Sequence, residues 1–111
     1  MKSLRFYRKR NGQEPFREWL ESINDSKTLA HVNNRVRRLA INHRGDFKRV
    51  GSGVYELRIH YGPGIRIYFA THRANVIILL MGGCKNSQKH DIQKAKRFWK
   101  DYKEQYHERS E

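Results

Sequence analysis

The sequence has little cysteine, and it has no cysteine pair. Cys84 is the single cysteine among 111 residues, so the chain offers neither an internal disulfide nor a zinc site made of thiolates. The six histidines show no spacing typical of a metal motif. We therefore expect a protein without metal or cofactor, in which Cys84 is a small residue filling a tight turn.

Long apolar segments are also missing. No run approaches the roughly 20 apolar residues of a membrane span. The charged residues 1–5 are not followed by the apolar region of a signal peptide. A chain of this length can bury a core without disulfides or metal. We expect one cytoplasmic domain over residues 1–111 that does not contact membranes.

Acidic residues are scarce relative to basic ones. The chain has 11 Asp and Glu against 24 Lys and Arg, a formal net charge of +13. Such an excess indicates a polyanionic partner, either nucleic acid or an acidic protein. A protein that only coats phosphate without catalysis would show the same excess.

The most informative stretch is residues 53–69, GVYELRIHYGPGIRIYF, which alternates apolar and polar residues on both sides of a Gly-Pro-Gly segment. This pattern predicts a β-hairpin with one buried face. A slip of one residue would bury two arginines, so we expect the register to be firmly specified. The shortest loop, residues 62–64, predicts the pairs Tyr61 with Ile65, Ile59 with Ile67, and Leu57 with Phe69.

The other face of this predicted hairpin gathers ionisable side chains. In the predicted register His60 lies across from Arg66, and Arg58 lies across from Tyr68, with Glu56 beside them. Directly opposed side chains on one face are within contact distance. A merely solvated face is the alternative, but this composition favours a functional site.

Periodicity also predicts the remaining elements. Pro15 suits the first turn of a helix, Asn24-Asp25-Ser26 supplies a turn and a cap, and Gly45 ends the second helix. The continuously apolar residues 76–81 predict a strand covered on both faces. The resulting fold class is α+β, with two N-terminal helices and a C-terminal helix packed on a twisted antiparallel sheet of four to five strands. The other predicted elements are strands at 3–8 and 46–50, a turn at 71–75, helices at 27–43 and 87–105, and a frayed tail at 107–111.

The hairpin and the later segment GGCKNSQKHDIQKAK together resemble the RelE/ParE toxin superfamily, specifically its phage-derived, HigB-like addiction module killer branch. The resemblance covers nearly the whole chain and implies a RelE-like fold. It also implies the toxin of a bacterial type II toxin-antitoxin module. Most characterised members cut messenger RNA on the translating 70S ribosome without metal. They are silenced by a cognate helix-turn-helix antitoxin, with which the otherwise monomeric toxin forms a larger complex.

The resemblance also implies which residues carry function. The important basic residues of the family correspond to Arg58, Arg66 and Lys85. Adjoining motif positions are Tyr68, Asn86, Gln88 and Asp91. Residues expected to contact RNA are Lys48, Arg49, Gln88 and Lys89.

A ribonuclease without metal uses the 2′-hydroxyl of its substrate as the nucleophile. Arg58 and Arg66 suit the charge that develops on the phosphorus, because a guanidinium donates two parallel hydrogen bonds to phosphate. His60 or Lys85 is the candidate for proton transfer. Tyr68 would position the substrate or donate a proton to the leaving oxygen.

Two other classes of function stay open. A ParE-like inhibitor of DNA gyrase would share the fold without needing these catalytic side chains. A non-enzymatic RNA-binding module would explain the net charge equally well.

Overall fold

The secondary structure follows the periodicity of the sequence. The computed structural model describes residues 1–43 and 45–110 of the chain. Within them, five strands and three α-helices form the α+β fold that the sequence predicts. The strands are β1 Ser3–Phe6, β2 Phe47–Gly51, β3 Val54–Ile59, β4 Ile65–His72 and β5 Val76–Cys84. The helices are α1 Pro15–Glu21, α2 Ser26–Ala40 and α3 Gln88–Ser110, with a 3₁₀ turn at Lys85–Ser87 before α3.

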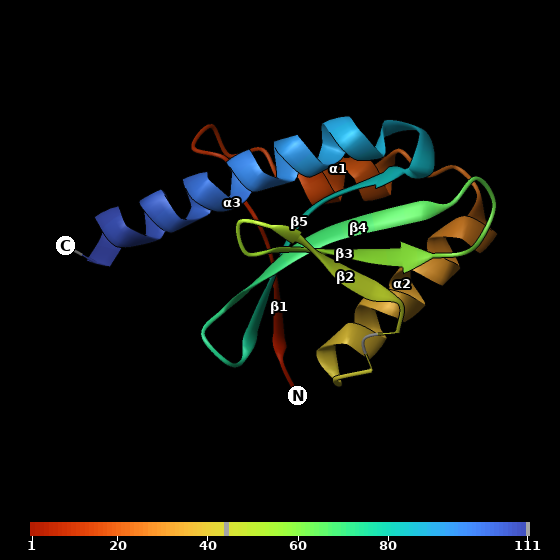
Figure 1. Cartoon of the computed structure of the whole chain (residues 1–111), viewed down its shortest axis with the longest axis horizontal. Coiled ribbons are helices and arrows are strands. Elements are labelled where there is room, and N and C mark those ends of the chain that lie inside the picture. The colour runs from red at the N-terminus through yellow and green to blue at the C-terminus, as the bar shows by residue number, and fades with distance from the viewer. Residues whose placement is uncertain (44, 111) are drawn as a thin grey trace.

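One sheet holds all the described strands in the order β1-β5-β4-β3-β2. Strands β2 to β5 are antiparallel to their neighbours, as predicted, whereas β1 joins the edge of β5 in parallel. The arrangement is consistent with the RelE-like architecture that the resemblance implies. Figure 1 shows α3 running across the sheet, with its C-terminal end reaching beyond the strands.

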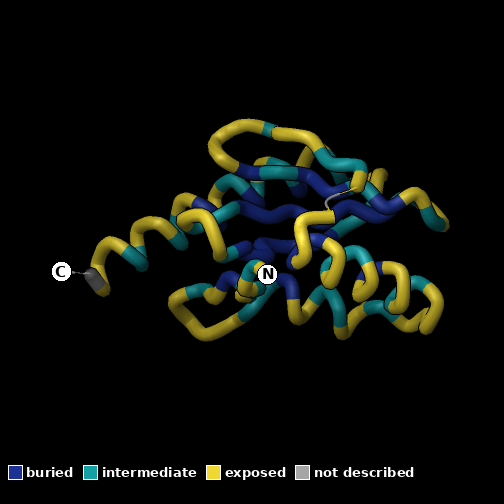
Figure 2. The backbone as a smooth tube through the Cα atoms, turned by 90° about the horizontal axis from the view of Figure 1, so that it is seen from below, coloured by how far each residue is buried: buried dark blue, intermediate teal, exposed yellow. Residues whose placement is uncertain are grey.

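The sheet is the middle of three layers. Helices α1 and α2 cover one face, where Leu57, Ile67 and Phe69 are buried, and α3 covers the other face. Strand β5 serves both cores, because Ile77 packs towards α1 and α2 while Ile78 packs towards α3. This confirms the prediction of a strand covered on both faces. Figure 2 shows the buried residues concentrated along these strands.

Two glycines at the end of β5 let helices approach the sheet from both sides. A Cβ atom at Gly82 would overlap the indole ring of Trp19 in α1, and one at Gly83 would overlap the carboxylate of Asp91 in α3. Only a residue without Cβ allows such contact. Close packing on both faces therefore explains the Gly-Gly pair in the sequence.

The boundaries of α2 agree with the prediction at the start and differ at the end. Asp25 caps the helix as predicted, since its carboxylate accepts hydrogen bonds from the N–H groups of Lys27 and Thr28 at 3.4 and 3.2 Å. The predicted end at Gly45 is wrong. The helix ends at Ala40, and Asn42 adopts the left-handed conformation (φ 69°), which asparagine tolerates better than most residues.

Other boundaries also differ from the predictions, among them the end of β1, which is Phe6 instead of Arg8. Strand β4 continues through Thr71 to His72, and the turn begins at Arg73 with φ 58°. Cys84 ends β5 instead of lying in a turn. The last helix continues to Ser110, so residues 107–110 are helical, and position 111 lies outside the described residues. No helix among residues 1–43 and 45–110 is long and apolar enough to cross a membrane.

The hairpin has the predicted faces but a different register. Leu57 pairs with Ile67 and Ile59 pairs with Ile65, which is a slip of two residues from the prediction. The reason is a wider loop, residues 60–64, in which the Gly64 N–H donates to the Tyr61 carbonyl at 3.1 Å. The ring of Tyr61 leaves the strand and stacks on His31 of α2, with ring centroids 4.0 Å apart.

Candidate active site

The loop end of the β3–β4 hairpin carries an open hollow of about 430 Å³. Loop residues 60–64 form one wall, and Arg66 and Lys85 complete the lining. The Lys85 N–H donates to the Gly64 carbonyl at 2.9 Å, which holds the end of β5 beside the loop. The structure therefore brings together three of the predicted site residues, namely His60, Arg66 and Lys85.

A buried carboxylate lies behind Arg66. Glu56 is 0% exposed and Arg66 is 7% exposed. Nε of Arg66 lies 4.0 Å from Oε1 of Glu56, and neither atom has a hydrogen bond to any described residue. The amide of Gln88 donates to Oε2 of the same carboxylate at 2.8 Å. Glu56 thus lies where its charge fixes the guanidinium of Arg66 next to the hollow.

Tyr68 lies inside the protein and not in the hollow. The side chain is fully buried, and its hydroxyl donates to Oε2 of Glu56 at 3.0 Å. Burial, followed by the charge of Glu56, raises the pKa of Tyr68 far above its ordinary value of 10.0. The predicted contact with the substrate or the leaving oxygen does not fit this position. Tyr68 instead supports the carboxylate that faces Arg66, as does Gln88. The contact of Gln88 with RNA stays a prediction.

Arg58 and His60 share a carboxylate that the sequence analysis did not identify, that of Asp46. Nη2 of Arg58 donates to Oδ1 of Asp46 at 2.9 Å, and Nε2 of His60 lies 2.6 Å from Oδ2. The hydrogen bond to His60, followed by Arg58, lowers the pKa of Asp46. The backbone of Asp46 lies beside the same strand, because its carbonyl accepts a hydrogen bond from the Arg58 N–H at 2.8 Å.

The observed register places two like charges directly opposite each other. Arg58 pairs with Arg66 across the strands, whereas the prediction placed Tyr68 opposite Arg58. Like charges in such a pair destabilise a sheet. Here each guanidinium has its own carboxylate, Asp46 for Arg58 and Glu56 for Arg66. The two carboxylates therefore allow both arginines to occupy one end of the hairpin.

The residues predicted to bind RNA do not share one surface. Lys48 is exposed and pairs with Glu56 across the strands, so it projects from the face that α3 covers. Arg49 projects from the opposite face, where its guanidinium lies 6.0 Å from the ring centre of Tyr55. Lys89 is exposed in the first turn of α3, and Asn86 is exposed just before that helix. Lys48 and Lys89 stay candidates for RNA contact, and Arg49 lies on the face of the sheet opposite Lys48.

Asp91 has a structural position in the same region. It is buried over Gly83, and its carboxylate accepts a hydrogen bond from the Ser87 hydroxyl at 2.5 Å. In the part of the chain that the structure describes, no group of three or more His, Cys, Asp or Glu side chains could hold a metal ion. The chemistry that these side chains present at the hollow is that of two cations and an imidazole, which suits a phosphate group.

Comparison with known proteins finds a family that matches most of this chain. A family model described as "Phage derived protein Gp49-like (DUF891)" matches residues 18–100. A protein of Haemophilus influenzae described as "Uncharacterized protein" is 40% identical over 81 residues, which cover 73% of this chain and 82% of that protein. The hairpin, the hollow and both carboxylates lie within the residues that the family model matches.

Proposed function

We propose that this chain, which belongs to the Gp49-like family of phage-derived proteins, is the toxin of a bacterial type II toxin-antitoxin module. We infer that it is a metal-independent endoribonuclease, which cuts messenger RNA on the translating ribosome and so inhibits growth. The resemblance to the RelE/ParE superfamily supports this activity. The observation that carries it is the convergence of His60, Arg66 and Lys85 on one hollow.

In the proposed reaction the RNA supplies its own nucleophile. A base removes the proton of the 2′-hydroxyl, whose oxygen attacks the adjacent phosphorus. The bond from phosphorus to the 5′-oxygen breaks, and that oxygen takes up a proton. The products are a 2′,3′-cyclic phosphate and a 5′-hydroxyl. The protein must therefore supply a base and positive charge near the phosphorus, while water entering the open hollow can protonate the leaving oxygen.

The positive charge would come from Arg66 and Lys85, which line the hollow. Glu56 lies on the buried side of Arg66, where it orients the guanidinium before any substrate arrives. Donors that are already in place need no reorganisation as charge develops in the transition state, so they stabilise it more effectively than mobile ones. Tyr68 and Gln88 hold Glu56 in place by hydrogen bonds. Nη1 of Arg66 itself donates to the Ile65 carbonyl at 3.3 Å.

We assign to His60 the removal of the proton from the 2′-hydroxyl, and to Lys85 only a positive charge near the phosphorus. The carboxylate of Asp46 lies 2.6 Å from Nε2 of His60, so it can orient the ring and stabilise the imidazolium that forms when the base takes up a proton. The His60 side chain is 71% exposed, which leaves its ring accessible to a substrate in the hollow. Arg58 stabilises the same carboxylate from its other oxygen.

The partners that this function requires are a ribosome and an antitoxin. The net charge of +13 supports binding to ribosomal RNA and messenger RNA through phosphate contacts with little sequence preference. A helix-turn-helix antitoxin, encoded by a short neighbouring reading frame, is the proposed inhibitor. Co-expression of that reading frame should restore growth.

A primer-extension assay on translating ribosomes tests the proposal. The wild-type protein should create new 5′ ends at the ribosomal A site, and Arg66→Lys should not. Arg37→Lys, the same change at an exposed position on α2, is the matched control and should cut like the wild type. Intact messages together with loss of DNA supercoiling activity would instead identify a gyrase inhibitor. Intact messages with RNA binding alone would identify a non-enzymatic module.

A further inference from the structure

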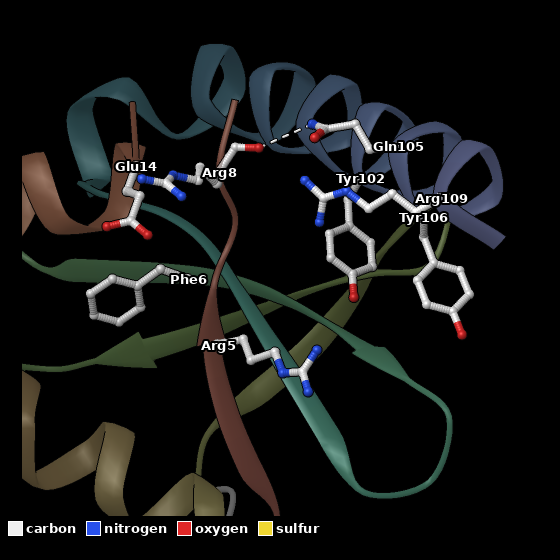
Figure 3. A pocket seen from close by; sticks show the side chains of 8 residues that line it. All are labelled: Arg5, Phe6, Arg8, Glu14, Tyr102, Gln105, Tyr106 and Arg109. Carbon is white, nitrogen blue, oxygen red and sulfur yellow. Dashed lines mark hydrogen bonds between the residues drawn. The ribbon is translucent and has the colours of Figure 1, made fainter. Parts of the chain in front are cut away.

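The C-terminal half of α3 encloses a second cavity, of about 250 Å³, with the edge strand β1 (Figure 3). Tyr102, Tyr106 and Arg109 line it from α3, and Arg5 and Arg8 line it from β1 and the segment that follows. We call these five residues the α3 overhang site. None of them belongs to the hairpin hollow.

The length of β4 separates the two sites. The strand begins beside the hollow and ends at His72, whose ring contacts those of Tyr102 and Tyr106 at centroid distances of 5.6 and 4.3 Å. A strand of eight residues spans roughly 25 Å. The two sites therefore lie at opposite ends of β4, roughly 25 Å apart.

Aromatic rings follow one another along this part of α3. Trp99 and Tyr102 are nearly parallel, with an interplanar angle of 12° and a centroid distance of 5.3 Å. Tyr102 and Tyr106 are also nearly parallel, at 14° and 6.5 Å. Aromatic side chains are the platforms on which unpaired bases stack in proteins that bind single strands.

The charge around these rings is positive. Arg5, Arg8 and Arg109 are exposed, and the guanidinium of Arg73 lies 5.7 Å from the ring centre of Tyr106, whose hydroxyl accepts its hydrogen bond at 2.5 Å. The lining includes the carboxylate of Glu14. That group is already paired with Arg17 at 2.6 Å.

We propose that the α3 overhang site binds single-stranded RNA, with bases stacked on Tyr102 and Tyr106 and phosphates contacted by the arginines. An acidic peptide would satisfy the arginines but would not need aromatic rings beside them. Bases satisfy both features, because every base has a π-face and every linkage has a phosphate. This inference goes beyond the nuclease, since the site needs no cleavage in order to bind.

Fluorescence anisotropy with a labelled 2′-O-methyl oligonucleotide tests the site directly. The methyl group blocks the 2′-oxygen, so the probe cannot be cut by the proposed reaction. Tyr106→Ala should weaken binding about tenfold, because a stacked base contributes roughly that factor, while Tyr106→Phe should bind like the wild type. Thermal unfolding of each variant checks that it is folded.

Two further variants separate the site from general charge. Arg109→Glu should weaken binding more than Arg37→Glu, which makes the same charge change at an exposed position on α2. Equal losses in these two variants, or unchanged binding by Tyr106→Ala, would overturn the proposal. So would an equal loss of affinity by Tyr106→Ala for a polyglutamate peptide of matched charge, which would favour an acidic protein segment as the ligand.

The same probe distinguishes this proposal from that of the nuclease. Arg66→Lys should lose cleavage. When Arg66→Lys is combined with Tyr106→Phe or with Tyr106→Ala, the two double variants should still differ about tenfold in affinity for the oligonucleotide. If messages stay intact with the wild-type protein, the nuclease fails while the binding result still stands. If the two Tyr106 variants bind equally well both with Arg66 and with Arg66→Lys, the proposal for the α3 overhang site is wrong and the nuclease proposal is unaffected.

Discussion

The hairpin hollow and the α3 overhang site are both cationic, but their arginines are held in different ways. In the hollow, Arg66 is nearly buried and faces a carboxylate that is fully buried. At the overhang, Arg5 and Arg109 are exposed and lie near tyrosine rings instead of buried carboxylates. The difference indicates that one site is fixed by internal electrostatics while the other can adapt to what it binds.

This difference matches the work that each site is proposed to do. Stabilising charge on a phosphorus requires a guanidinium in one orientation, and a buried ion pair provides it at a cost in desolvation. Holding a strand of variable sequence requires faces and charges that tolerate small shifts. The comparison can therefore be tested by removing the parts that fix the hollow and measuring whether the overhang responds.

Glu56→Ala should give the largest effect on stability. It would leave the buried guanidinium of Arg66 uncompensated, and breaking a buried pair in this way costs about 3–5 kcal/mol. Urea unfolding would measure the loss. Glu14→Ala, which breaks the exposed pair with Arg17 at the overhang, is the control and should leave the unfolding midpoint nearly unchanged. Equal changes in the two variants would contradict the distinction between the sites.

Arg66→Lys should lower cleavage about 100-fold while changing stability much less than Glu56→Ala. Lysine keeps a positive charge near Glu56, so the protein should fold, but it lacks the planar pair of donors that a phosphorane needs. Single-turnover cleavage of messenger RNA on ribosomes measures the effect. A variant that cuts as fast as the wild type would remove Arg66 from the mechanism.

The faces of the hairpin could be predicted from sequence, but its register could not. Alternation determines which residues face the core, and a slip of one residue would reverse that choice. A slip of two residues keeps Leu57, Ile59 and Ile67 on the same face, so the hydrophobic pattern cannot distinguish the two registers. The wider loop determines the register. Its hydrogen bonds involve Tyr61 and Gly64 and depend on backbone conformation.

The candidate site was predicted as a set of cations, and its supports were not. Arg66, Lys85 and His60 were recognised from residue type and resemblance, and they do line one hollow. The buried position of Glu56 and the contact of Asp46 with His60 depend on tertiary packing, which the spacing of residues does not reveal. The same is true of the overhang site, where β1 and α3 meet although they lie at opposite ends of the sequence.

Tyr68→Phe should make the stability of the protein less sensitive to alkaline pH. The folded-state pKa of Tyr68 is raised above 10.0, first by burial, so its contribution is fully present below pH 10 and is lost as the pH rises beyond it. The loss amounts to at most about 1.4 kcal/mol per pH unit. Urea unfolding between pH 9 and about 11 should show a shallower slope in the variant. An identical slope would place the Tyr68 hydroxyl in water.

The hydroxyl of Tyr7 provides a matched case in the core next to α3. Burial, followed by its hydrogen bond to Asp101, also raises the pKa of Tyr7. The double variant with Phe at positions 7 and 68 should therefore be the least sensitive to alkali. If stability falls with rising pH as steeply in the double variant as in Tyr68→Phe alone, Tyr7 does not contribute to the alkaline loss of stability.

Asp46→Asn should give the smallest change in stability, and only above about pH 4. The pKa of Asp46 is depressed below 3.8, first by His60, so the carboxylate stabilises the fold above that pH and its contribution is lost as the pH falls below about 4. The variant should lack this acid dependence, so it should match the wild type in stability at pH 3 and be slightly less stable near neutrality. Because Asp46 is 39% exposed, solvent screens it far more than Glu56, and its main effect should be on His60 and on the rate of cleavage. Urea unfolding at pH 3 and pH 7 measures this dependence in both proteins. If the unfolding midpoint changes by the same amount between these pH values in the variant and in the wild type, the carboxylate of Asp46 does not hold the imidazole of His60.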